Sequence, residues 1–211
     1  MEPRDAEKPR TRREEYAEIT RQAILDAARQ LFREQGFFAT RVDQIAERAR
    51  VSPATVYAVA GGKQGLLWRL IDSFTTDPIV AATIEHMATL DDPRAVIAFV
   101  AEAVRTMREQ GADLVRLMLT TAPHDKAVAE MRDVATARYR DSLTPIAGHL
   151  LRLGAVKPDI DLPGCVDVLW FYLGFSGLTT LVEENGWSYD RAAAWLAEET
   201  ARSLLQPEGQ A

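Results

Sequence analysis

The stretch TRVDQIAERARVSPATVYAVAGGK, residues Thr40–Lys63, decides the fold of this chain. Its first half places Val42, Ile45 and Ala49 at i, i+3 and i+7. This spacing predicts one apolar stripe on a short helix whose other face is charged.

A second helix is predicted to begin at Ser52-Pro53. Serine caps a helix N-terminus well, and proline fits the first helical position because no backbone N–H is needed there. The Gly61-Gly62 pair is expected to end this helix. Two helices joined by about three residues form a helix-turn-helix, whose second helix can enter a DNA major groove.

The second helix carries residues suited to DNA contact. Its first residues are small, so its backbone can approach base edges, while hydroxyl groups on Thr55 and Tyr57 can reach bases or phosphates. Arg41 and Lys63 are expected to meet phosphates. The predicted DNA-binding residues are Thr40, Arg41, Ser52, Pro53, Ala54, Thr55, Tyr57 and Lys63.

Five blocks of sequence resemble the DNA-binding domain of TetR-family transcriptional regulators. The similarity covers about residues 20–74, and both the order and the spacing of the blocks fit. The resemblance implies an all-α protein in which a three-helix DNA-binding domain precedes a larger helical domain for effector binding and dimerisation. The blocks are Arg21-x-x-Ile24-Leu25-x-Ala27-Ala28-x-x-Leu31-Phe32-x-x-x-Gly36-Phe37, Val42-x-x-Ile45-Ala46, Val51-Ser52, Thr55-Val56-Tyr57 and Lys63-x-x-Leu66-Leu67.

The sequence departs from the family pattern in three ways. Arg50 stands where the family usually has glycine, which would cost on the order of 1 kcal/mol if the backbone there keeps a positive φ. Small side chains stand at Val59 and Ala60, so fewer groups can reach DNA. Arg41 replaces the usual capping hydroxyl, and Thr40 is then the expected cap, with Asp43 completing a capping box.

The composition suits a globular cytoplasmic protein. The chain has 211 residues, 47% of them hydrophobic, which is enough for a buried core. Cys165 is the single cysteine, so an internal disulfide is excluded, and the N-terminus has no apolar signal stretch. No run is expected to reach the length of a membrane span.

The acidic charge lies away from the motif. Residues 1–73 hold 13 Lys and Arg against 11 Asp and Glu, about +2, whereas the whole chain carries −6. A nearly neutral domain can bind DNA through a few placed cations, with a strong dependence on salt. We expect a tail over residues 1–15, disordered or an arm that reaches a minor groove through its arginines, a DNA-binding domain over 16–74 and an effector and dimerisation domain over 75–206.

The second domain is predicted to contain helices over residues 79–90, 94–110, 114–121, 125–153, 165–184 and 189–205. Gly111 is expected to close the second of these, and the 165–184 helix is apolar nearly all round. Methionine and aromatic side chains between helices suit an adaptable apolar pocket, although each could simply fill core. The predicted pocket residues are Phe99, Met107, Met118, Met131, Tyr139, Trp170, Phe171 and Phe175.

The last two helices are the expected dimer interface, because TetR-like proteins pair two long C-terminal helices into a four-helix bundle. A helix-turn-helix reads only a few base pairs, so two copies are needed about one DNA turn, ~34–36 Å, apart. The predicted interface residues are Gly174, Gly177, Leu178, Leu181, Trp195 and Leu196.

The leading hypothesis is a homodimeric repressor that binds a palindromic operator and leaves it when a small apolar or aromatic ligand binds. Ligand binding is expected to shift the helix after Lys63 and the segment 79–90. The alternative is a helical small-molecule binding protein or enzyme with a vestigial DNA-binding motif. No catalytic motif is present, the three histidines do not stand at metal-ligand spacing, and we expect no cofactor.

Overall fold

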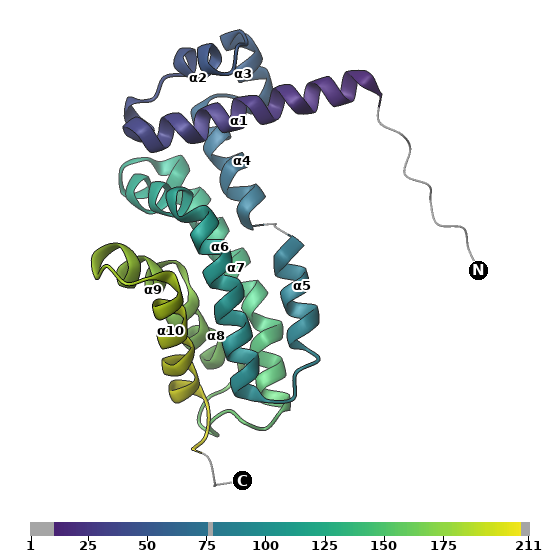
Figure 1. Cartoon of the computed structure of the whole chain (residues 1–211), viewed down its shortest axis with the longest axis vertical. Coiled ribbons are helices and arrows are strands. Elements are labelled where there is room, and N and C mark those ends of the chain that lie inside the picture. Colours follow the sequence, from purple (N-terminus) through teal and green to yellow (C-terminus); the bar gives the residue numbers. More distant parts are fainter. Residues whose placement is uncertain (1–10, 76–77, 208–211) are drawn as a thin grey trace, which may run out of the picture. The chain divides into compact units, whose positions relative to one another are not determined.

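The computed structural model describes residues 11–75 and 78–207 and is built from helices (Figure 1). The described residues contain no strand, only an isolated antiparallel bridge between Val156 and Leu205. The chain divides into two compact units, residues 1–70 and 71–211, and the division falls inside the fourth helix. The helices are α1 (Arg12–Ala39), α2 (Val42–Arg48), α3 (Pro53–Ala60), α4 (Lys63–Thr75), α5 (Pro78–Met87), α6 (Pro93–Thr121), α7 (Lys126–Arg152), α8 (Leu162–Leu173), α9 (Phe175–Thr179) and α10 (Tyr189–Leu204).

Helix α1 begins earlier than the sequence indicated. Thr11 caps it, and Glu14 completes a capping box by accepting from the Thr11 backbone N–H at 2.7 Å. The prediction of a disordered tail through residue 15 is therefore wrong for residues 12–15, and residues 1–10 lie outside the described range. Near its end the helix is interrupted at Gly36, whose φ of 80° suits glycine.

Helices α2 and α3 form the expected helix-turn-helix. Ile45 and Ala46 of α2 and Val56 of α3 are buried in the first unit with the apolar face of α1. Ser52 caps α3, because its Oγ accepts the Thr55 backbone N–H at 3.1 Å. The helix ends at Gly61, which has a φ of 71°.

The turn after α2 places Arg50 in the left-handed region, with a φ of 56°. The Arg50 N–H donates to Glu47 O at 3.1 Å and the Val51 N–H donates to Ala46 O at 2.9 Å. This pair of bonds is the Schellman arrangement, in which glycine normally occupies the position that Arg50 holds. The backbone thus keeps a positive φ although the residue is not glycine, so the cost stated for this departure from the family pattern applies.

In the second unit, α6, α7, α8 and α10 run side by side, with α5 packed against α6 and α7 (Figure 1). Their shared core includes Val100, Leu143, Leu169 and Leu204. Cys165 is fully buried in the same core, and burial raises the pKa of its thiol to about 11. Pro145 lies inside α7.

Two predicted helix ends in this unit are wrong. Gly111 does not close a helix, because α6 continues through it to Thr121 and buries it. The stretch 165–184 is not one helix, since the backbone at Gly174 is extended and separates α8 from α9, after which Thr180–Glu184 is a π-helical turn.

The expectation that no run could span a membrane is also corrected. The stretch Leu162–Glu184 is long and apolar enough by length and composition, with a mean hydropathy of 1.5. Its backbone is broken at Gly174, and 44% of its apolar window is buried within the protein. Just under half of this window is thus accounted for by the core of a helical domain.

Candidate DNA-binding surface and effector cavity

Helix α3 presents a small polar and aromatic face to solvent. Ser52, Pro53 and Ala54 are exposed at its start, and Tyr57 is 54% exposed one turn later. The Ser52 and Thr55 hydroxyl groups lie 2.8 Å apart, so Thr55 is tied to the cap and only partly exposed. Such a surface can approach base edges closely, while the Tyr57 hydroxyl can reach a base or a phosphate.

The structure gives Thr40 and Lys63, two of the predicted DNA contacts, structural roles instead. Thr40 is 1% exposed, and its hydroxyl donates to Gly36 O at 2.7 Å, so it neither caps α2 nor reaches the surface. Gln44 accepts the Arg41 N–H at 2.9 Å instead, and the Arg41 side chain is exposed at the start of α2.

Lys63 anchors the end of α1. Its ammonium donates to the carbonyl oxygens of Phe37, Phe38 and Thr40 at 2.7, 3.3 and 3.2 Å, and lies 4.5 Å from the centre of the Phe37 ring. Because these bonds use the three N–H groups of the ammonium, the predicted phosphate contact of Lys63 is replaced by a structural role.

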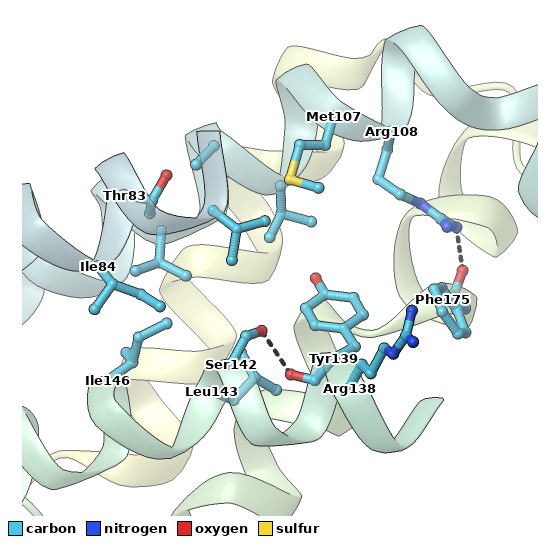
Figure 2. Close-up of a pocket in the computed structure, with 14 residues that line it drawn as sticks. Thr83, Ile84, Met107, Arg108, Arg138, Tyr139, Ser142, Leu143, Ile146 and Phe175 are labelled. Atoms are coloured by element: carbon cyan, nitrogen blue, oxygen red, sulfur yellow. Dashed lines mark hydrogen bonds between the residues drawn. The ribbon is translucent and has the colours of Figure 1, made fainter. Parts of the chain in front are cut away.

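The second unit contains an apolar cavity of about 80 Å³ between α5, α6, α7 and α9. A water molecule needs roughly 10–15 Å³ by this measure, so the cavity has room for a small organic molecule. Figure 2 shows Thr83, Ile84 and Ile146 on one side and Arg108 and Phe175 on the other. The lining residues are Val80, Thr83, Ile84, Val100, Ala103, Val104, Met107, Arg108, Arg138, Tyr139, Ser142, Leu143, Ile146 and Phe175.

Aromatic rings build one wall of the cavity. Tyr139 and Phe175 lie 5.6 Å apart, and Trp170 packs behind them at 5.4 and 5.3 Å. The Tyr139 hydroxyl donates to Leu173 O at 2.6 Å, and burial raises the pKa of Tyr139 to about 12. Tyr139 is therefore a neutral group held by α8, not an acid or base at ordinary pH.

Arg108 of α6 is a buried, charged residue of the cavity wall that the sequence reasoning missed. Its side chain is 4% exposed and donates to Phe175 O and to Thr179 Oγ1, the latter at 2.6 Å. Burial lowers the pKa of the guanidinium. A signal was present in the sequence, because Val100, Val104 and Arg108 follow at intervals of four and place the arginine on the apolar stripe.

A second arginine connects the cavity wall to α4. Arg138 of α7 lines the cavity and forms an ion pair with Asp72 at 2.5 Å. Asp72 stands in the part of α4 that belongs to the second unit, just after the division at Leu70. The cavity wall is thereby bonded to the helix that continues into the DNA-binding unit.

Three of the eight predicted pocket residues line the cavity, namely Met107, Tyr139 and Phe175. Met118 and Met131 are buried elsewhere, and Trp170 lies behind the aromatic wall. Phe99 faces a separate surface hollow, where its ring lies 4.6 Å from that of His86. Phe171 is 73% exposed, so its assignment to the pocket is wrong.

The predicted interface residues are mostly internal. Leu178, Leu181 and Leu196 belong to the core of the second unit. A Cβ atom at Gly174 would lie 2.3 Å from Trp170 O, and one at Gly177 would lie 2.3 Å from Tyr172 O, so both glycines serve packing within the chain. Trp195, 43% exposed, is the most accessible of the six, and it lines a surface hollow together with Phe171, Gly177, Leu181 and Leu196.

Solved structures of similar fold cover nearly the whole chain. The structure of the SmeT–triclosan complex matches with a TM-score of 0.72 and 19% identity, covering 90% of this chain and 93% of that one. The regulator FadR from Bacillus subtilis in complex with stearoyl-CoA matches with a TM-score of 0.71 and 15% identity, over 86% and 98% of the two chains. At these identities the likeness establishes the fold.

Sequence comparison identifies the family. Residues 24–70 match the model of the bacterial regulatory proteins, tetR family. The HTH-type transcriptional regulator BetI of Burkholderia ambifaria is 26% identical over 164 residues, which cover 76% of this chain and 84% of BetI. The uncharacterized HTH-type transcriptional regulator YdeS of Bacillus subtilis is 25% identical over 171 residues, 80% of this chain and 83% of YdeS. With its helix-turn-helix and its helical second unit, the chain is a DNA-binding transcriptional regulator of the TetR family.

Proposed function

We propose that this protein is a cytoplasmic homodimeric repressor that binds a palindromic operator and is released by a small, largely apolar ligand. The observation that carries the ligand part is the apolar cavity between α5, α6, α7 and α9. Two structures of similar fold are complexes with small molecules, one with triclosan and one with stearoyl-CoA, and they support a small-molecule effector. Exposed residues at the start of α3 would supply the DNA contacts, with Arg41 as a phosphate anchor.

Dimerisation is proposed to use the outer face of α8 and α10. Phe171 and Trp195 are exposed large apolar side chains that line one surface hollow. Exposed aromatic residues of this kind are common anchors of protein interfaces. A second copy of the chain on this face would supply the second recognition helix that a palindromic operator requires.

The route from ligand to DNA is proposed to pass through α4. A ligand in the cavity would contact the wall that carries Arg138, whose partner Asp72 lies on α4. A ligand that binds better to one position of α4 than to another shifts the population toward that position. The separation of the two recognition helices in the dimer would change with it.

The test is a gel-shift titration of the full chain against the DNA that flanks its own gene, across a salt series. Tyr57→Ala is expected to weaken binding by about ten-fold, because a base or phosphate contact is worth roughly 1–3 kcal/mol. Tyr57→Phe is the matched control that keeps the ring and removes only the hydroxyl. Equal affinity of Tyr57→Ala and wild type would refute the assignment of α3 as the recognition helix.

Binding that is absent even at low salt would refute the repressor proposal itself. It would favour the alternative of a helical small-molecule binding protein with a vestigial motif. Small side chains at Val59 and Ala60 are the feature that keeps this alternative open.

A further inference from the structure

Arg108 is a buried cation that forms no ion pair with a carboxylate among the described residues, although Glu183 lies near enough to act on its charge. Both of its hydrogen bonds come from Nη2 and go to neutral acceptors, Phe175 O and Thr179 Oγ1. Its Nη1 is buried and has no hydrogen-bond partner among the described residues. The carboxylate of Glu183 accepts from Arg116 Nε at 2.7 Å instead. A buried charge left in this state is costly unless an anion joins it.

A purely structural role does not explain the charge. Without Arg108, the carbonyl oxygen of Phe175 would still accept from the Thr179 hydroxyl at 2.8 Å. A methionine of similar length could fill the same space without leaving an acceptor unpaired. The fold therefore needs a long side chain at this position and not a guanidinium.

The cavity wall opposite Arg108 is almost wholly apolar. Ile84 and Ile146 lie opposite Arg108 and Phe175 (Figure 2). A second space beside Arg108, lined also by Thr179 and Glu183, measures about 10 Å³ and holds at most about one water molecule. Of these two spaces beside Arg108, the apolar cavity of about 80 Å³ is the one with room for a larger anion.

We propose that the effector is a small apolar carboxylic acid, bound as its anion, with the carboxylate on Arg108 and the hydrocarbon part against Ile84, Val100, Leu143 and Ile146. This inference rests on the proposed effector-binding function and specifies its chemistry. The planar guanidinium matches a carboxylate in shape and charge, and its Nη1 is the donor that has no hydrogen-bond partner among the described residues. A neutral ligand would leave the buried charge as it is.

The test compares acids with their primary amides, which have the same shape but no charge. The full chain is titrated with straight-chain and phenyl-substituted acids of roughly four to ten carbons and with the matching amides. Binding is followed by tryptophan fluorescence, because Trp170 packs against the rings of Tyr139 and Phe175, and by the shift of the melting temperature.

The variant Arg108→Met removes the charge and keeps the length. Arg105→Met is the matched control on the same helix, since Arg105 pairs with Glu102 and Glu109 and does not line the cavity. Wild type and Arg105→Met are expected to prefer acids over amides by at least about ten-fold. The preference should disappear in Arg108→Met, while binding of the amides stays equal or improves.

Three results would overturn the proposal. These are equal binding of acids and amides by wild type, a preference that persists in Arg108→Met, and no binding of any acid in the series up to millimolar concentration. Ligand-free protein gives a further check, because removing an uncompensated buried charge should raise the melting temperature of Arg108→Met. A lowered melting temperature would make Arg108 a structural bond between α6 and α9 and would also overturn the proposal.

The outcome is separable from that of the proposed function. An acid that binds through Arg108 but leaves the gel shift unchanged would refute release from DNA and keep the carboxylate site. A protein that binds DNA and prefers no acid would keep the regulator and refute the carboxylate site.

Discussion

At the scale of single residues, the turn between α2 and α3 carries backbone strain. Arg50 occupies the C′ position of a Schellman motif with a φ of 56°, where a Cβ atom crowds the backbone. Both hydrogen bonds of the motif are formed despite the side chain. The cost of the conformation is therefore offset by the packing of the helix-turn-helix around it.

Relieving this strain should stabilise the first unit. Arg50→Gly is expected to raise the free energy of unfolding of this unit by about 0.5–1 kcal/mol. Glycine removes the steric strain of a Cβ atom at positive φ, and this stabilisation exceeds the destabilisation from the greater conformational entropy of the unfolded chain. Chemical denaturation followed by circular dichroism measures the change. Arg50→Ala removes the same charge but keeps the Cβ atom, so a gain of equal size in this control would show that charge, not strain, is responsible.

Lys63 and Arg108 illustrate what sequence cannot reveal about a residue. Their charge suggested solvent or phosphate for Lys63 and suggested nothing for Arg108. The role of each depends on carbonyl groups that lie 23 to 26 residues away for Lys63 and 67 residues away for Arg108. Such partners become visible only when the chain is folded.

At the scale of elements, α3 and α4 approach each other as closely as the backbone allows. A Cβ atom added to Gly65 would lie 1.6 Å from Ala60 O, a backbone atom that cannot move aside without moving α3. The position of the recognition helix thus depends on the absence of a side chain in the first turn of α4.

Gly65→Ala is expected to destabilise the first unit by at least the ~1–3 kcal/mol that is typical of overpacking. The same substitution should abolish DNA binding. Gly148→Ala in α7 is the control, since its Cβ atom would meet only Arg152 Nη1 at an ordinary 3.6 Å. That variant should be stabilised by roughly 0.5–1 kcal/mol, as for alanine in place of glycine within a helix. Thermal melting and the gel shift together measure both effects. Normal DNA binding by Gly65→Ala would contradict the close approach.

Helix starts were easier to predict than helix ends. Ser52 with Pro53 and Asp92 with Pro93 carry their caps in the local sequence, and both helices begin there. Gly111 and Gly174 look alike in sequence, yet α6 runs through the first and the helix stops at the second. Both glycines are buried, so the surrounding tertiary packing, and not the glycine itself, decides whether the helix continues.

At the scale of the whole molecule, the second unit leaves an apolar face uncovered. Phe171 and Trp195 stand out from α8 and α10 while the leucines around them are buried. The pattern of apolar residues predicted that the 165–184 stretch would be buried on two sides. It could not separate the side that faces the chain's own core from the side proposed to face a second copy.

Phe171→Glu should convert the proposed dimer to monomers. Placing a charge in an interface anchor costs about 2 kcal/mol or more, which weakens the dimer at least ~30-fold. Sedimentation velocity over a range of concentrations measures this, and the operator affinity should fall in parallel. Val134→Glu changes another exposed apolar residue, on α7, and is expected to leave the dimer intact. A dimer unaffected by Phe171→Glu would show that the interface lies elsewhere.

The one thiol of the chain offers a built-in probe of opening. Cys165 lies at 0% exposure in the core of the second unit, with a pKa near 11, so in the folded protein it is neither accessible nor ionised. A disulfide reagent can therefore label it only after that core opens, and the labelling rate reports the opening equilibrium. Changes confined to the first unit should leave the rate unchanged, whereas a bound effector should slow it.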